Sequence, residues 1–316
     1  MKKIILGWSF GGDTGLKNAV KNISKGKALV IDVEDISAFD TKHIYIGKYF
    51  EQHKISEFTS AFIRYPYDLI PPYTKTYSSR ELTEFLKTLA LMFSHISVNP
   101  ITHGSISRNR IYGLSIASRC GLKTPSSLAI THSISGGFKK DALSKKHITK
   151  CLGNCYFSET LSRKDYPLKK YLSFEEDGGD TAYIYPAHTV SKNKNINKHI
   201  HDFGVCFLQD FIVGDEFRMY VIKNQIFSYK RSASSREDKS ADTFLNTEAT
   251  LSKEDVGKIL KLVKMLNLSY LCLDIIITHD LRELVIIDIN PYGSLPAFAL
   301  FPAPTEALAH LILEKV

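Results

Sequence analysis

Residues 271–290 have the sequence LCLDIIITHDLRELVIIDIN. Two apolar runs joined by a short polar loop are typical of a β-hairpin. With the loop centred on Leu281, Asp274 lies directly opposite Asp288. Because side chains alternate along a strand, Asp274, Asp288 and Asn290 share one face, and the other face is apolar. The predicted apolar face consists of Leu271, Leu273, Ile275, Ile277, Val285, Ile287 and Ile289.

The two opposed carboxylates require a compensating positive charge. Cβ atoms of directly opposed residues lie about 4.5–5.5 Å apart, and like charges at that separation destabilise a hairpin. Mg²⁺ binds carboxylate and amide oxygens and completes its shell with phosphates and water. We therefore predict a Mg²⁺ site at Asp274, Asp288 and Asn290. The alternative is a register that differs by a residue or two, with Asp288 solvated and Asn290 only part of a turn.

A second predicted hairpin adds charged side chains of both signs. Residues 217–231 contain two apolar runs joined by a two-residue polar loop, which is typical of a tight hairpin. The pairing places Glu216 opposite Arg231, with Arg218 on the same face. The alternative interpretation is a surface ion pair on a solvated face.

The remaining patterns predict an α/β protein, with α+β organisation in the C-terminal half. Strands alternate with helices in the first hundred residues, which favours a parallel sheet. The C-terminal part is rich in strands and contains one amphipathic helix, residues 253–266. We expect three domains, namely residues 1–105, 106–190 and 191–316.

Composition limits the class of protein. Of the 316 residues, 44% are hydrophobic and 23% charged, which is typical of a globular protein rather than a disordered one. No stretch has the roughly 18 apolar residues of a membrane span, and the apolar run at residues 4–6 is too short for a signal peptide. Five cysteines without a CxxC pair argue against disulfides and zinc. We expect a cytoplasmic protein without a membrane partner.

The net charge of +8 suggests nucleic-acid binding until its position is examined. Residues 139–170 contain nine Lys and Arg against three acidic residues, so most of the excess is local. A local basic segment suits phosphate groups or an acidic peptide. We therefore expect no nucleic-acid partner.

The motifs of the two hairpins together resemble those of a known family. Residues 288–293, Asp-x-Asn-Pro-x-Gly, close the last hairpin, and residues 209–212, QDFI, precede the first. This arrangement resembles the ATP-grasp ligases, most closely the branch with the ribosomal-protein glutamate ligase RimK and the microviridin-type graspetide ligases. The resemblance implies an ATP-grasp fold preceded by an N-terminal α/β domain, with ATP and Mg²⁺ as cofactors. That branch more often has Glu where this chain has Asp288.

The resemblance also implies roles for individual residues. Arg218 and its neighbour Arg231 are the catalytic candidates, because a guanidinium matches carboxylate and phosphate oxygens bidentately. Lys150 and Arg110 are candidate phosphate ligands, and Glu216 is a candidate ribose ligand. The segment that would contact the adenine edge consists of Gln209, Asp210, Phe211 and Ile212.

The implied activity is ATP-dependent ligation of a carboxylate to an amine or a hydroxyl. The reaction would pass through an acyl phosphate, release ADP and phosphate, and act on a peptide or amino acid. The alternative is a non-catalytic nucleotide- or peptide-binding module, because the acidic segment 175–180 stands where the family has a glycine-rich phosphate loop. A homodimer is compatible with either function. The sequence does not choose between amide and ester products.

Overall fold

The structure is a computed structural model. It describes residues 2–6, 14–32, 36, 38–40, 42–48, 51–63, 88, 90–99, 110–130, 147–150, 156–157, 183–184, 188–190, 206–232, 243–245, 248–291 and 302–314. Among these residues, no helix has both the length and the apolar character needed to cross a bilayer.

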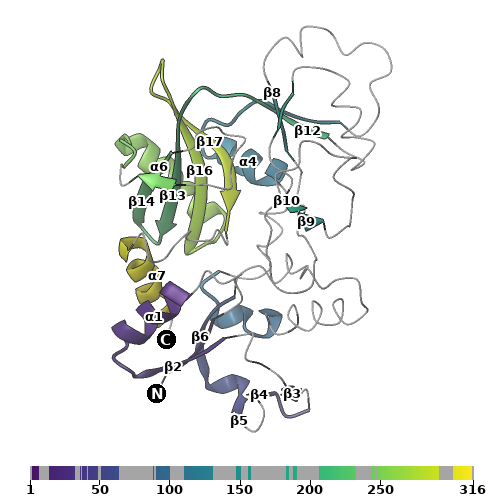
Figure 1. Cartoon of the computed structure of the whole chain (residues 1–316), viewed down its shortest axis with the longest axis vertical. Coiled ribbons are helices and arrows are strands. Elements are labelled where there is room, and N and C mark those ends of the chain that lie inside the picture. Colours follow the sequence, from purple (N-terminus) through teal and green to yellow (C-terminus); the bar gives the residue numbers. More distant parts are fainter. Residues whose placement is uncertain are drawn as a thin grey trace.

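A five-stranded antiparallel sheet contains both predicted hairpins (Figure 1). The strand order is β15-β14-β13-β16-β17. Asp274 lies opposite Asp288, and Phe217 opposite Lys230, so both predicted pairings are confirmed. The strands are β13 (Gly214–Ile222), β14 (Gln225–Ser232), β15 (Thr243–Leu245), β16 (Tyr270–Thr278) and β17 (Leu284–Asn290).

A register shift beside the opposed acids alters the apolar face of the hairpin. Ile275 lies opposite Ile286 rather than Ile287, so β17 has one extra residue between Asp288 and the loop. Such a bulge moves the following side chains to the other face. Leu284 and Ile286 therefore enter the core, and the prediction that Val285 and Ile287 would occupy those positions was wrong.

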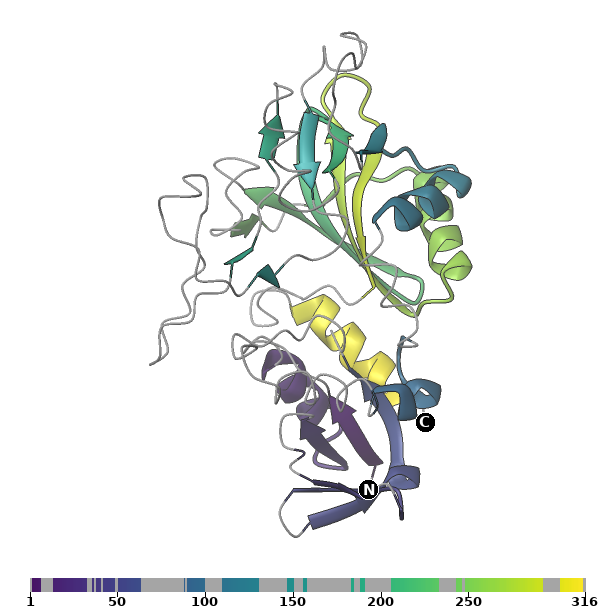
Figure 2. The same ribbon diagram turned by 90° about the vertical axis from the view of Figure 1, so that its right-hand side faces the viewer.

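Two helices cover the apolar face of this sheet, α4 (Arg110–Arg119) and α6 (Lys253–Met265) (Figure 2). Ser252 caps α6, because its hydroxyl accepts a hydrogen bond from the Asp255 amide at 3.0 Å. The apolar cluster beneath the helices removes one whole sheet face from water and leaves the opposite face for polar groups. Its fully buried members include Ala117, Ile259, Leu262, Met219, Leu271, Leu273, Ile275 and Ile286.

The N-terminal part contains the predicted parallel sheet, with strand order β2-β1-β6. A three-stranded antiparallel meander, β3-β4-β5, follows β2 in the sequence. The elements are β1 (Lys2–Leu6), α1 (Thr14–Ile23), β2 (Ala28–Asp32), β3 (Ala38–Asp40), β4 (Tyr45–Lys48), β5 (Glu51–Lys54), η2 (Ile55–Glu57), β6 (Phe58–Phe62) and η3 (Ser94–Ile96).

The last helix, α7 (Pro302–Glu314), lies between the N-terminal sheet and the five-stranded sheet (Figure 1). It contacts α1, β6 and β13. A second apolar cluster therefore joins the two sheets through this helix. Its fully buried side chains include Ile4, Leu16, Val20, Tyr220, Tyr270, Leu308 and Ile312.

A four-stranded sheet of order β11-β8-β12-β7 belongs to the middle of the chain. Most of the basic segment 139–170 and all of the acidic segment 175–180 lie outside the described part of the chain. The strands are β7 (Ser127–Ile130), β8 (His147–Lys150), β11 (His188–Val190) and β12 (Cys206–Asp210), with a separate pair β9 (Tyr156–Phe157) and β10 (Tyr183–Ile184).

The buried side chain of Asn99 ties the N-terminal part to the hairpin strand β16. Its Nδ2 donates to the carbonyl oxygens of Tyr270 and Pro291 at 2.7 and 2.6 Å. Its Oδ1 accepts from the amides of Ser269 and Tyr270 at 3.0 and 3.1 Å. All four hydrogen-bonding positions of the amide are therefore used.

Asn99→Ala is expected to lower the free energy of unfolding by about 2–4 kcal/mol, because buried backbone groups lose their partners. Urea unfolding of the whole chain measures the change. Asn224→Ala, in an exposed turn, is the control and should change little. Equal unfolding midpoints for the two variants would show that the Asn99 hydrogen bonds do not stabilise the fold.

Gly214 and Gly257 should respond in opposite directions to alanine. A Cβ on Gly214 would lie 2.2 Å from the Ile277 carbonyl oxygen, whereas a Cβ on Gly257 meets nothing within 4 Å. Gly214→Ala should therefore destabilise the protein through overlap with β16. Gly257→Ala, inside α6, should stabilise it by about 0.5–1 kcal/mol. Thermal unfolding measures both, and a shift of the same sign in both variants would contradict the prediction.

Candidate functional site

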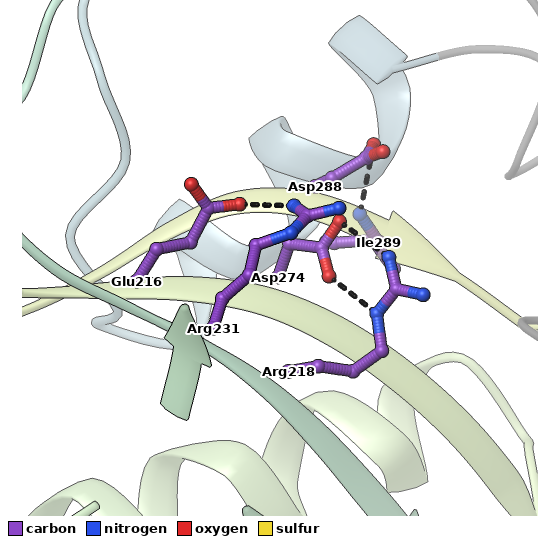
Figure 3. A network of polar contacts seen from close by, with 6 residues as sticks. All are labelled: Glu216, Arg218, Arg231, Asp274, Asp288 and Ile289. Carbon is purple, nitrogen blue, oxygen red and sulfur yellow. Dashed lines mark hydrogen bonds and ion pairs between the residues drawn. The ribbon is translucent and has the colours of Figure 1, made fainter. Parts of the chain in front are cut away.

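Charged side chains form a row across the central strands of the five-stranded sheet (Figure 3). Arg218 on β13 lies opposite Asp274 on β16, and Asp274 lies opposite Asp288 on β17. Arg218 Nε and Nη2 donate to the two carboxylate oxygens of Asp274 at 2.9 and 3.2 Å. This bidentate geometry fixes both side chains. The sequence predicted the two acids as neighbours but not Arg218 beside them.

A second ion pair lies on the same face, between Arg231 on β14 and Glu216 on β13 (Figure 3). Arg231 Nη1 donates to Glu216 Oε1. The guanidinium of Arg231 is buried and the Glu216 side chain is mostly buried. The predicted placement of Glu216, Arg218 and Arg231 on one face is thus correct, and the pair is not a solvated surface contact.

Nearby groups keep Arg218 charged in spite of its burial. Loss of water opposes the charge on Arg218, but the surrounding groups, with the Asp274 carboxylate first among them, outweigh that effect and raise the guanidinium pKa well above its ordinary value. Arg218 is therefore always charged and needs an anion beside it. Removal of Asp274 alone would take from the buried Arg218 guanidinium its bidentate carboxylate partner.

Asp288 also has an arginine beside it. Arg110 is the first residue of α4, and its Nε lies 3.5 Å from Asp288 Oδ1. The same oxygen accepts a hydrogen bond from the Ile289 amide at 3.1 Å. Arg110, which the resemblance implied as a phosphate ligand, thus contacts a predicted metal ligand.

The same face carries two neutral groups that the sequence did not predict there, the Cys272 thiol and the Tyr220 hydroxyl. Cys272 lies opposite Asn290 and Tyr220, and burial raises the pKa of its thiol to about 12, so the thiol stays protonated at neutral pH. The buried hydroxyl of Tyr220 has no hydrogen-bond partner in the described part of the chain. Strand alternation could have predicted their place on this face. Cys272 is two residues from Asp274, and Tyr220 is two residues from Arg218.

The oxygen-rich end of the row suits a hard cation. Asp274 and Asp288 lie side by side, and Asn290 follows Asp288 on the same strand. Two carboxylates and one amide match the ligand preference of Mg²⁺ and leave positions for phosphate and water. Among the described residues, no group of three or more His, Cys, Asp and Glu side chains has a metal-binding arrangement.

The strand β12 holds the candidate nucleotide ligands. Gln209 is only 2% exposed, and its Nε2 has no hydrogen-bond partner among the described residues. A buried donor without a partner is costly, so this Nε2 is a candidate to donate to a bound ligand. Asp210 ends β12, and Phe211 and Ile212 form the connection to β13; all three are partly buried. These positions suit contact with a nucleobase.

Lys150 ends β8, and its backbone lies opposite Phe207 on β12. The position of its side chain lies outside the described residues. The phosphate-binding role of Lys150 stays a prediction.

Comparison with solved structures identifies the fold. The macrocyclase MdnC from Microcystis aeruginosa MRC, bound with precursor peptide MdnA, matches over 100% of both chains with a TM-score of 0.73 and 17% identity. A RiPP-associated ATP-grasp ligase from Chryseobacterium gregarium, in complex with ADP and a leader and core peptide, matches over 100% of this chain and 98% of its own, with a TM-score of 0.71 and 16% identity.

A more distant match extends the same conclusion. The D-alanine–D-alanine ligase from Bacillus anthracis, complexed with ATP, has a TM-score of 0.55 and 14% identity over 99% of this chain and 96% of its own. No family model and no curated protein matches the sequence. The chain has the ATP-grasp fold, and the predicted fold class is confirmed.

Single removal of either partner of the Arg218–Asp274 pair should destabilise the protein more than removal of both. Arg218→Met and Asp274→Leu each take the bidentate partner from a buried charge, which costs about 3–5 kcal/mol. The double variant carries neither charge and should recover much of the loss. Urea unfolding of the four proteins measures the coupling energy.

The exposed pair Lys223–Glu314 provides the control for this cycle. Its neutralisation by Glu314→Gln should change stability little, because water screens exposed ion pairs. Additive losses for Arg218→Met and Asp274→Leu would show that the two side chains are not energetically coupled.

Proposed function

We propose that the protein is an ATP-dependent ligase that joins a carboxylate to an amine or a hydroxyl through an acyl phosphate. The observation that carries this proposal is the row Arg218–Asp274–Asp288 on one face of the central sheet of an ATP-grasp fold. A guanidinium beside two carboxylates supplies both a cation for an anionic reacting group and oxygen ligands for a metal.

A peptide is the substrate class that the proposal favours. Two of the similar structures are complexes with precursor, leader or core peptides. The local excess of Lys and Arg in residues 139–170 would attract an acidic peptide. A free amino acid is the second candidate substrate.

Each candidate ligand has a role in this proposal. Gln209, with Asp210, Phe211 and Ile212, would bind the adenine edge, and Glu216 would bind the ribose hydroxyls. Lys150 and Arg110 would bind the phosphates. Asp274, Asp288 and Asn290 would hold Mg²⁺, which when bound draws negative charge from the phosphate oxygens.

In the first step, a substrate carboxylate oxygen attacks the γ-phosphorus of ATP, and the bond to the β-phosphate oxygen breaks. The products are an acyl phosphate and ADP. Arg218 stabilises the charge that develops on the transferred group, because its guanidinium is fixed and permanently charged. Arg231 lies on the same face and holds the Glu216 side chain in place.

In the second step, the amine or hydroxyl attacks the acyl carbon. Inorganic phosphate leaves, and the nucleophile loses one proton. The protein contributes by aligning the two substrates and by excluding water from the acyl phosphate. The product is an amide or an ester.

The proposal also includes a division into domains at residues 1–105, 106–190 and 191–316, a homodimeric assembly, a cytoplasmic location, and function without nucleic acid or membrane. A short peptide gene beside this one would support the peptide substrate.

Asp288→Ala is expected to lower phosphate release from MgATP by at least about 10²-fold, because the metal that stabilises the transferred group would lose a carboxylate ligand. The assay contains the full chain and, where a neighbouring gene encodes a short peptide, that peptide. Mass spectrometry of the peptide reports the loss of one water for each bond formed.

The control is Glu283→Gln. Glu283 lies in the loop of the same hairpin and forms an ion pair with Lys123. This variant should retain the parent rate. Phosphate release by Asp288→Ala at the parent rate would overturn the site assignment. Nucleotide binding by the wild type without any phosphate release would instead favour the non-catalytic binding module.

A further inference from the structure

The contact between Arg110 and Asp288 is weaker than the neighbouring arginine–carboxylate pair. The Nε–Oδ1 separation is 3.5 Å, and the buried Nε of Arg110 makes no hydrogen bond among the described residues. Arg218, by contrast, donates two hydrogen bonds to Asp274. Arg110 therefore supplies charge to Asp288 without a directed bond, and a better ligand can displace it.

Arg110 also lies where an anion is favoured. It begins α4, and the amino end of a helix carries partial positive charge. Its side chain is 16% exposed and that of Asp288 is 22% exposed, so both retain a path to solvent. A guanidinium displaced from Asp288 would remain beside the helix end, where it can bind a phosphate oxygen.

The row Arg218–Asp274–Asp288 and the adjacent Arg110 together carry no net charge without a metal ion. Two arginines, Arg218 and Arg110, balance the two carboxylates Asp274 and Asp288. The compensation that the opposed acids require is therefore present in the protein itself. A divalent cation that binds these carboxylates has to compete with both guanidinium groups.

We propose that Arg110 couples metal binding to nucleotide binding by an exchange of ion-pair partners at Asp288. In the nucleotide-free protein Arg110 neutralises Asp288 and weakens binding of the free cation. When the cation arrives with a triphosphate, Asp288 turns to the metal and Arg110 turns to a phosphate oxygen. This inference rests on the proposed function of the site, since it requires a metal and a nucleotide there.

The exchange has a thermodynamic consequence. If the triphosphate stabilises the displaced arginine, nucleotide raises the affinity for metal, and metal raises the affinity for nucleotide by the same factor. Such coupling is typically 5- to 150-fold. Loss of Arg110 should therefore strengthen binding of the metal alone and weaken binding of the nucleotide with metal.

The test uses MnCl₂ and AMPPNP with the full chain. Electron paramagnetic resonance measures binding of Mn²⁺ alone, and calorimetry measures AMPPNP binding with and without Mn²⁺. Arg110→Met should bind Mn²⁺ alone at least about fivefold more tightly than the wild type. It should bind AMPPNP with Mn²⁺ more weakly, so that the coupling factor falls. A merely structural role for Arg110 would weaken both.

Two further variants separate the proposed exchange from general charge effects. Arg119→Met removes an exposed arginine from the last turn of the same helix and should change neither affinity. In Arg110→Met combined with Asp288→Asn, the gain in Mn²⁺ affinity should disappear. If Arg110→Met binds Mn²⁺ no more tightly than the wild type, the exchange is wrong while the proposed function stands. If the wild type does not bind AMPPNP with Mn²⁺ at all, both proposals are wrong.

Discussion

The charge balance between Asp274 and Asp288 and the two arginines beside them underlies the rest of the site. Register places the carboxylates opposite each other in a sheet whose other face is packed against α4 and α6. Like charges at such a separation repel, so cations must be close. Arg218 comes from the neighbouring strand and Arg110 from the start of a helix. The site therefore depends on three separate parts of the chain.

The hairpin of β16 and β17 packs against the core with one face and carries polar groups on the other. Alternation sends leucine and isoleucine side chains to the core and acids to the other face. The bulge beside Asp288 keeps the acids in register and still brings Ile286 into the core. An additional residue in one strand thus allows the polar end and the loop end of the hairpin to follow different registers.

Contacts far from the charges hold this sheet in place. Asn99 binds backbone groups of Ser269, Tyr270 and Pro291, where the last hairpin begins and ends, at its open end. The helix α7 fills the space between the N-terminal sheet and β13 (Figure 2). The polar face thus continues directly into an apolar interface with the N-terminal part, and Tyr220 and Cys272 stand at that boundary.

The sequence by itself determined the two hairpins, the opposition of Asp274 and Asp288, and the shared face of Glu216, Arg218 and Arg231. These features follow from alternation and loop length, which act between residues close in sequence. Only the tertiary structure brought β13 beside β16, and so Arg218 to Asp274, because strand order is set by packing over long sequence separations. The bulge and the approach of Arg110 to Asp288 have the same origin, since both depend on how α4 and the core fit against the sheet.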